Sequence, residues 1–236
     1  MKALILNSGL GSRMGDIVAT HPKCMTQLND SETIISRQLK LLSLSKIHDV
    51  IITTGYFDKI LEEYCYSLDL PLNYTFVKNP LYNQTNYIYS ILCAKEYIKD
   101  QTVILMHGDL VFVKEVLDKI ISFNGSCMKI SSTLPLPQKD FKALICNSLI
   151  KKIGVDLFDN NAVEAQAMYK LYPKELNLWL DKIEEFCNTG KVNCYAENAF
   201  NEIKDNCPIY GCDVKDLLCS EVDNYEDLEN VIKKLK

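Results

Sequence analysis

Near its start, the chain has a short apolar segment that runs directly into a glycine-rich segment. Residues 3–6, Ala-Leu-Ile-Leu, read as a buried strand, and the segment that follows has glycines at positions 9, 11 and 15. Glycine lets the backbone approach a ligand closely, and free N–H groups at a helix N-terminus favour anions. The pattern predicts a phosphate-binding loop. It fits neither the P-loop pattern nor the spacing of the dinucleotide fingerprint.

The first half of the chain alternates between strand and helix patterns, which is typical of a parallel sheet with crossover helices. The predicted strands cover residues 3–6, 49–55, 72–77 and 103–106, and the predicted helices cover residues 34–44, 59–68 and 87–98. In such sheets ligands bind at the carboxyl ends of the strands. The glycine loop and His107-Gly108-Asp109 are both expected at that edge.

After about residue 125 the predicted strands become antiparallel. They cover residues 127–132, 143–146, 149–155 and 194–195, with a tight turn at Asn147-Ser148 between the second and third. Helices are predicted over residues 176–187, 198–204 and 224–235. We therefore expect a single α/β domain over residues 1–236, with a mixed, mostly parallel sheet flanked by helices and an insertion that contains antiparallel strands.

Composition limits the class of partner. With a net charge of −5 and no long basic cluster, the chain lacks the electrostatic footprint of a nucleic-acid-binding protein. No stretch approaches the roughly 18–20 apolar residues of a membrane span, and the first residues do not form a signal peptide. We expect a cytoplasmic protein without membrane insertion. The ten cysteines include no C-x-x-C pair and are interpreted as scattered thiols.

Two cations and two carboxylates complete a candidate site. Arg13 in the glycine loop and Lys23 after Pro22 can neutralise a triphosphate and the charge that develops when it is attacked. Asp109, at the end of an apolar strand, is suited to holding Mg²⁺ through oxygen ligands, and Asp223 offers a partner. Each carboxylate has an alternative role as a helix N-cap. The residues alone leave that choice open.

These motifs resemble the sugar-nucleotidyltransferase family of Rossmann-like enzymes. The likeness rests on Leu6-Asn7-Ser8-Gly9-Leu10-Gly11-Ser12-Arg13-Met14-Gly15 with Pro22-Lys23, on Gly108-Asp109 and on Glu221-Val222-Asp223. Asn7-Ser8 replaces two alanines of the family pattern. The resemblance implies a single Rossmann-like nucleotidyltransferase domain with a nucleotide-binding half at residues 1–125. An acceptor-binding part would follow at 126–215, and a metal-ligand segment with the C-terminal helix at 216–236.

Within that family the chain is most similar to the compact bacterial phosphocholine cytidylyltransferases and their relatives that act on 2-aminoethylphosphonate. The N-x-x-Y-x-x-x-N-x-x-x-S segment from Asn79 to Ser90 is similar to the segment that lines their cytosine pocket. The resemblance implies transfer of CMP from CTP to a small phosphorylated or phosphonate acceptor, with release of pyrophosphate.

The resemblance also implies a role for each site residue. Lys23 would hold the α-phosphate and the incoming group, Arg13 the β- and γ-phosphates, and Asp109 with Asp223 the Mg²⁺. Asn86 and Ser90 would meet the base and ribose. The other implied nucleotide-binding residues are Leu6, Asn7, Ser8, Gly9, Gly11, Ser12 and Gly108.

The resemblance places the acceptor over the insertion, where two segments are expected to line it: Lys139-Asp140-Phe141-Lys142 and Ala196-Glu197-Asn198-Ala199. From these segments Lys142, Glu197 and Asn198 are selected as acceptor-binding residues. Lys142 suits an acceptor with an extra negative charge, and its alternative is an ordinary surface lysine. Glu197 can receive an amino group, and its alternative is a carboxylate at a helix start. Phosphocholine, 2-aminoethylphosphonate and a phosphorylated amino acid such as phosphoglutamine all remain candidates.

Two other functions share part of the pattern. A sugar-1-phosphate uridylyl- or thymidylyltransferase would have the same loop and metal site but a different base pocket and acceptor. A non-catalytic nucleotide-binding regulator would normally have lost Lys23, Asp109 or Asp223, and all three are present. The sequence leaves the oligomeric state open, a homodimer included.

Overall fold

The computed structural model describes residues 1–11, 14–15 and 19–236. The helices are α1 (Ile34–Ser43), α2 (Asp58–Ser67), α3 (Tyr87–Ile98), α4 (Lys114–Ser122), α5 (Pro173–Asn188), α6 (Ala196–Ile203) and α7 (Tyr225–Leu235), with a 3₁₀ turn, η2, at Lys23–Met25. The strands are β1 (Lys2–Leu6), β2 (Gln27–Asn29), β3 (Glu32–Thr33), β4 (Asp49–Thr54), β5 (Asn73–Lys78), β6 (Val103–His107), β7 (Leu110–Phe112), β8 (Cys127–Ser131), β9 (Lys142–Cys146), β10 (Leu149–Gly154), β11 (Ala162–Leu171), β12 (Tyr210–Asp213) and β13 (Cys219–Glu221).

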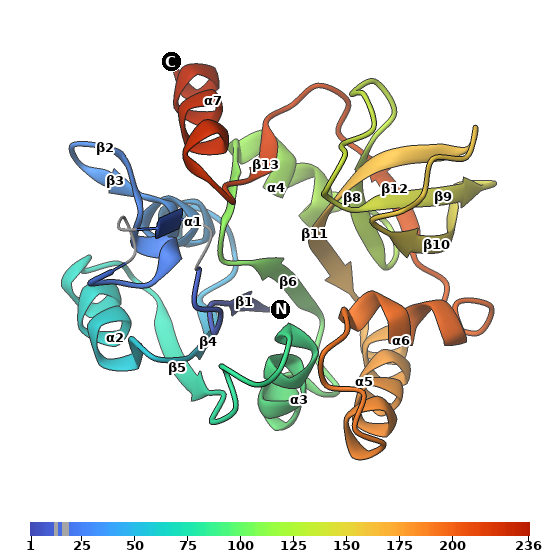
Figure 1. Cartoon of the computed structure of the whole chain (residues 1–236), viewed down its shortest axis with the longest axis horizontal. Coiled ribbons are helices and arrows are strands. Elements are labelled where there is room, and N and C mark those ends of the chain that lie inside the picture. The colour runs from blue at the N-terminus through green and yellow to red at the C-terminus, as the bar shows by residue number, and fades with distance from the viewer. Residues whose placement is uncertain (12–13, 16–18) are drawn as a thin grey trace.

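A nine-stranded mixed sheet runs through the described part of the chain in the order β5-β4-β1-β6-β11-β8-β12-β10-β9 (Figure 1). The strands β5, β4, β1 and β6 are parallel, with Leu6 of β1 level with Thr53 of β4 and His107 of β6. Their carboxyl ends therefore meet at one edge, where the glycine loop and Asp109 follow. The mixed α/β fold expected from the sequence is confirmed.

The second half of the sheet is mainly antiparallel. The long strand β11 pairs antiparallel with β6 and β8 and also contacts β9, so it joins the two halves. The β9–β10 hairpin forms where the sequence predicted it, and its turn residues Asn147 and Ser148 both have positive φ, +50° and +64°. Two successive positive φ angles are the backbone of the turn type that suits hairpin twist, although the second residue is not glycine.

Alternating strand residues send apolar side chains to both faces of the sheet. Leu4, Leu6 and Leu105 pack with α3, α5 and α6 on one face, whereas Ile5 and Met106 pack with α1, α2 and α4 on the other. Helix α7 belongs to a smaller cluster with Leu28, Ile34 and Val222. Because both faces are covered, the strand edge that carries the polar loops is left as the place for a ligand.

Some elements differ from the sequence-based expectation. Strand β11 was missed, because Glu164, Gln166 and Lys170 interrupt its apolar pattern although all three are buried. Glu164 accepts a hydrogen bond from Lys129 at 2.7 Å, which offsets the cost of burying its charge. Helix α4 was also missed. The strand expected at residues 194–195 is wrong, because these residues belong to an irregular connection between α5 and α6.

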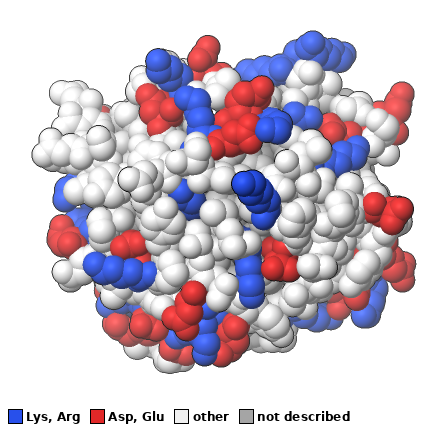
Figure 2. All heavy atoms as spheres, turned by 180° about the vertical axis from the view of Figure 1, so that it is seen from behind, with Lys and Arg blue, Asp and Glu red and all other residues white. Residues whose placement is uncertain are grey.

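The surface carries charges of both signs. On the face shown in Figure 2, basic and acidic side chains are interspersed rather than gathered in one patch. Among the described residues, the helices include none that is long and apolar enough to cross a membrane. All ten cysteines are free thiols, as the sequence predicted.

Candidate active site

A cavity of about 870 Å³ opens at the carboxyl ends of β1 and β6. It extends from the glycine loop past the N-terminus of α3 to the segment that precedes β9. The cavity brings together most of the residues singled out in the sequence: Leu6, Asn7, Ser8, Gly9, Gly11, Lys23, Asn86, Ser90, Gly108, Asp109 and Asp223. Ser12 and Arg13 lie outside the described residues.

Two glycines in the cavity wall occupy positions where a side chain would not fit. Gly11 has a φ of +66°, and a Cβ there would lie 3.0 Å from Cβ of Lys23. A Cβ on Gly108 would lie 1.7 Å from Oδ1 of Asn7. The absence of both side chains lets the loop pack over Lys23 and lets Asn7 cross the end of β6. Asn7 lines the cavity, and its Nδ2 is buried without a hydrogen-bond partner among the described residues, so the cavity wall contains an unused donor.

Lys23 lies between the two predicted metal ligands. Its Nζ donates to Oδ2 of Asp109 at 2.6 Å and to Oδ1 of Asp223 at 2.6 Å. Burial opposes the charge of Lys23, but the two carboxylates outweigh it and raise its pKa. Burial likewise opposes the charge of Asp109, and Lys23 with His107 holds its pKa below the ordinary value. One cation thus links η2, the β6–β7 connection and the segment before α7.

Neither aspartate acts as a helix N-cap. The N-cap of α7 is Asn224, which forms a capping box with Asp227, so Asp223 is not the cap. Asp109 is followed by β7, and the N-cap of the next helix, α4, is Val113. Oδ1 of Asp109 is buried and has no hydrogen-bond partner among the described residues. Both carboxylates instead contact Lys23 in the cavity wall.

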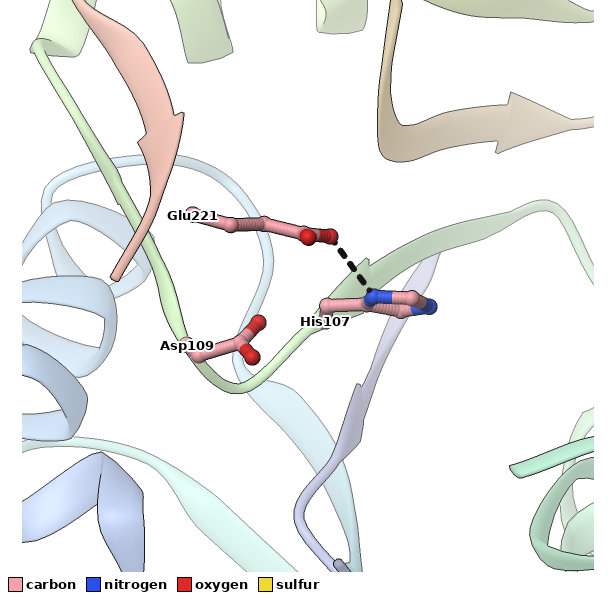
Figure 3. A group of neighbouring side chains, drawn as sticks. All are labelled: His107, Asp109 and Glu221. Carbon is pink, nitrogen blue, oxygen red and sulfur yellow. Dashed lines mark hydrogen bonds and ion pairs between the residues drawn. The ribbon is translucent and has the colours of Figure 1, made fainter. Parts of the chain in front are cut away.

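His107 and Glu221 form a second ion pair beside the first. Nδ1 of His107 lies 2.9 Å from Oε1 of Glu221, and Figure 3 shows both side chains next to Asp109. Burial disfavours the charged imidazole, but Glu221 outweighs it and raises the pKa of His107 to about 9. One ligand atom from each of His107, Asp109 and Glu221 lies within 4.8 Å of the others, and the same holds for Asp140, Glu221 and Asp223.

The segment from Asn79 to Ser90 forms another wall of the cavity. Asn86 is the N-cap of α3 and accepts from the backbone N–H of Tyr87 at 2.7 Å. Ser90 is on the first turns of the same helix, and its Oγ accepts from Nδ2 of Asn79 at 3.0 Å. Asn79 was part of the sequence motif but was not assigned a role. Its contacts show that the motif residues pack on one another.

The far end of the cavity is aromatic and acidic. The Tyr195 ring stacks on Tyr87 with centroids 6.0 Å apart and meets the edge of Phe141 at 5.2 Å. Asp140, next to Phe141 in the chain, and Lys139 also line the cavity, and a carboxylate oxygen of Asp140 lies within 4.8 Å of oxygens of Glu221 and Asp223 beside the Lys23 cluster. Lys139, Asp140 and Phe141 belong to a segment that the resemblance suggested for the acceptor, whereas Tyr87 and Tyr195 were assigned no role.

The three residues predicted for the acceptor are not part of the cavity lining. Lys142 is 0% exposed, and its ammonium donates to the carbonyls of Asp140 and Val155 and lies 4.4 Å from the centroid of the Phe158 ring. Burial lowers the pKa of Lys142. Asn198 is exposed on α6. Lys142 therefore supports the backbone behind Asp140, rather than presenting its charge to the cavity.

Glu197 has a structural partner on each carboxylate oxygen. Its side chain, on a residue 2% exposed, accepts from the hydroxyl of Tyr169 at 2.7 Å and from the hydroxyl of Tyr87. Because Tyr87 lines the cavity, Glu197 contacts the wall of the site from behind. The sequence could not reveal this, since the two tyrosines lie 28 and 110 positions away from Glu197.

A mixed α/β sheet whose strand edge carries a glycine loop, a lysine and two aspartates in one cavity is the arrangement expected of a nucleotidyltransferase. The comparison with protein families identifies which kind. Residues 3–123 match the MobA-like NTP transferase domain. The chain belongs to this family and is a nucleotidyltransferase.

Individual relatives extend the likeness beyond the matched segment. The chain is 25% identical over 181 residues to the CTP:phosphoglutamine cytidylyltransferase of Campylobacter jejuni, covering 70% of each protein. It is 24% identical to the choline-phosphate cytidylyltransferase of Haemophilus influenzae, covering 100% of this chain and 97% of that one. The solved structure of the CTP:phosphocholine cytidylyltransferase from Streptococcus pneumoniae superposes with a TM-score of 0.80 at 19% identity, over 100% and 99% of the two chains.

Proposed function

We propose that this nucleotidyltransferase is a CTP-dependent cytidylyltransferase that transfers CMP to a small phosphorylated or phosphonate acceptor bearing an amino or ammonium group, and releases pyrophosphate. One observation carries the proposal. A single cavity contains the glycine loop, the Lys23–Asp109–Asp223 cluster, the Asn79-to-Ser90 segment and an aromatic, acidic end. These four parts correspond to the triphosphate, the reacting phosphorus, the base and the acceptor.

The nucleotide half of the proposal is supported by relatives and by local chemistry. The relatives from Campylobacter jejuni and Haemophilus influenzae are both named for cytidylyl transfer. In this chain the loop backbone and Nδ2 of Asn7 offer donors for phosphate oxygens, and Lys23 offers a charge. Such fixed donors stabilise the charge that develops on the α-phosphate, and little further chemistry is required of the protein.

The residues present also fit a divalent cation. Asp109 and Asp223 supply oxygen ligands, which Mg²⁺ prefers, and Oδ1 of Asp109 is buried without a partner among the described residues. The two carboxylates hold the ammonium of Lys23 between them, so the position already attracts positive charge. We propose Mg²⁺ as the cofactor, with Asp109 and Asp223 as its ligands. Bound there, Mg²⁺ would neutralise triphosphate charge and so ease the departure of pyrophosphate.

The reaction is a single displacement. An oxygen of the acceptor's phosphate or phosphonate attacks the α-phosphorus of CTP, and the bond to the bridging oxygen of pyrophosphate breaks. The electron pair of that bond leaves with pyrophosphate. Lys23 donates to the α-phosphate oxygens, while Asn86 and Ser90 orient the base and ribose. No general base is needed because the nucleophile is already an anion.

The acceptor half of the proposal rests on the aromatic, acidic end of the cavity. The rings of Tyr87, Tyr195 and Phe141 present faces and edges, and Asp140 and Glu221 present carboxylates. Aromatic faces combined with carboxylates suit a cationic group. Lys142, which suggested an acceptor with an added negative charge, is occupied by backbone carbonyls. Phosphocholine, 2-aminoethylphosphonate and phosphoglutamine each carry an amino or ammonium group.

Pyrophosphate release tests the proposal directly. The purified protein is incubated with Mg²⁺ and one of CTP, UTP, GTP, ATP or dTTP. Each mixture receives phosphocholine, 2-aminoethylphosphonate, phosphoglutamine or glucose 1-phosphate. We expect turnover with CTP and an amino-bearing acceptor. Turnover of UTP or dTTP with the sugar phosphate, and none with CTP, contradicts the proposal and supports the sugar-1-phosphate alternative. CTP binding without turnover of any acceptor supports the non-catalytic regulator.

A further inference from the structure

Asn79 forms three hydrogen bonds through its side-chain amide, and one of them shows which atom of the amide is the oxygen and which is the nitrogen. Oδ1 accepts from the backbone N–H of Leu81 at 2.8 Å. A backbone nitrogen can only donate, so the other arm is Nδ2. Nδ2 donates to Oγ1 of Thr85 at 3.1 Å and to Oγ of Ser90 at 3.0 Å. Asn79 is 1% exposed, which leaves its amide little freedom to turn.

The hydroxyls of Thr85 and Ser90 both accept from Asn79, but only one of them also donates its own hydrogen. Thr85 donates to the carbonyl of Leu81 at 2.9 Å, so its hydrogen is used. Among the described residues, nothing accepts the hydrogen of Ser90. Ser90 is 1% exposed and lines the cavity. A buried hydroxyl hydrogen without an acceptor is costly, so the site favours a ligand that supplies one.

The two pyrimidine bases differ at ring atom N3. N3 of cytosine is a hydrogen-bond acceptor, whereas N3 of uracil carries a hydrogen. We propose that the hydroxyl of Ser90 meets N3 of the base, and that Asn79 makes the site selective for cytosine over uracil because it donates to Oγ of Ser90 and so turns the hydroxyl hydrogen toward that atom. This inference rests on the proposed function, in which Ser90 meets the base. Asn79 is then a positioning residue that acts through Ser90.

The substitution Asn79→Asp reverses the direction of this hydrogen bond. An aspartate at position 79 still accepts from the Leu81 N–H through one oxygen, but its second oxygen cannot donate. The hydroxyl of Ser90 must then donate to the aspartate, and its oxygen faces the base as an acceptor. That arrangement suits the N3–H of uracil and no longer supplies a donor to cytosine. The added negative charge weakens binding of both triphosphates alike, so it cancels from their ratio.

The experiment measures kcat/KM and the dissociation constant for CTP and UTP, with the acceptor that supports turnover. We expect Asn79→Asp to lower the ratio of CTP to UTP at least roughly tenfold, the usual effect of leaving a buried polar group unpaired. Ser90→Ala should also lower the ratio. In a double-mutant cycle, adding Asn79→Asp to Ser90→Ala should change the ratio no further, because Ser90→Ala has already removed the hydroxyl through which Asn79 acts.

Thr85→Val is the matched control. It removes the other hydroxyl that accepts from Asn79 but leaves the Asn79–Ser90 contact, so it should change CTP and UTP equally. If Asn79 only holds the segment in shape, Asn79→Asp will behave like this control, and an unchanged ratio overturns the inference. An unchanged ratio in Ser90→Ala overturns it as well, even if the aspartate variant does not fold. A wild-type protein that prefers UTP contradicts the proposed function itself.

Discussion

Nζ of Lys23 lies 2.6 Å from Oδ2 of Asp109, although 86 positions separate the two residues. The same ammonium contacts Asp223 at 2.6 Å. In the proposed reaction Lys23 has a different partner, the α-phosphate of the nucleotide. The lysine must therefore exchange carboxylates for a phosphate when the substrate binds, and this exchange leads to two predictions.

Lys23→Ala should lower turnover at least about a hundredfold, because it removes a cation from the developing charge on the α-phosphate. Pyrophosphate release under saturating CTP and acceptor measures the effect. Lys40→Ala is a suitable comparison, since Lys40 is a cation on α1 that is not among the residues lining the cavity. A near-normal rate for Lys23→Ala would remove Lys23 from the catalytic site.

Lys23→Gln should bind a divalent cation more tightly than the wild type when no nucleotide is present. The wild-type ammonium and the cation compete for Asp109 and Asp223. Losing a charge-assisted hydrogen bond of about 1.5 kcal/mol corresponds to a gain in affinity of roughly tenfold. Titration with Mn²⁺, followed by electron paramagnetic resonance, measures the free ion and does not depend on activity. Equal or weaker binding by the variant would show that no such competition exists.

Glu197→Leu should raise the KM for the acceptor more than the KM for the nucleotide, because Glu197 holds the hydroxyl of Tyr87 from behind the aromatic wall. It should also lower the free energy of unfolding by about 1–3 kcal/mol for each buried hydroxyl left unpaired. Glu197→Gln keeps one acceptor oxygen and should lie between the wild type and Glu197→Leu in both measurements. If Glu197→Leu raised both KM values in parallel, a positioning role for Glu197 would be excluded.

Gly108→Ala should destabilise the protein, because its Cβ would lie 1.7 Å from Oδ1 of Asn7. Overpacking of this kind costs about 1–3 kcal/mol, and here it also displaces a side chain of the cavity. Gly154→Ala provides the control, since a Cβ at position 154 would lie 3.6 Å from Cγ of Leu157, an ordinary van der Waals distance. Chemical denaturation compares the two variants. Equal midpoints would contradict the close approach of Asn7 to Gly108.

The nucleotide end of the cavity could be predicted from the sequence because its signals are local. The apolar segment at β1, the glycines and Asp109 after β6 each stand next to a recognisable strand, and parallel strands bring their ends together. Even there the sequence did not reveal that Lys23 contacts both aspartates, since that contact depends on where η2 and the segment before α7 pack.

The acceptor end could not be predicted in the same way. Lys142 and Glu197 were selected for their charge, but the ammonium of Lys142 is used by backbone carbonyls of Asp140 and Val155, and the carboxylate of Glu197 by two tyrosines far along the chain. Strand β11 was missed for a related reason: Glu164 has a buried partner, Lys129, on a neighbouring strand, so its charge does not mark an exposed position. Sequence patterns indicate burial through apolar residues and cannot register polar groups that are paired after folding.

The placement of Tyr87 immediately after Asn86 has a consequence for how this site can diversify. Asn86, Tyr87 and Ser90 all line the cavity, and in the proposed function the start of α3 serves both substrates, the base through Asn86 and Ser90 and the acceptor through Tyr87. The other two aromatic residues proposed to contact the acceptor, Phe141 and Tyr195, come from connections outside the segment that matches the family. A change of acceptor can therefore be made by replacing those two connections, whereas any adjustment of α3 itself would alter both substrates at once.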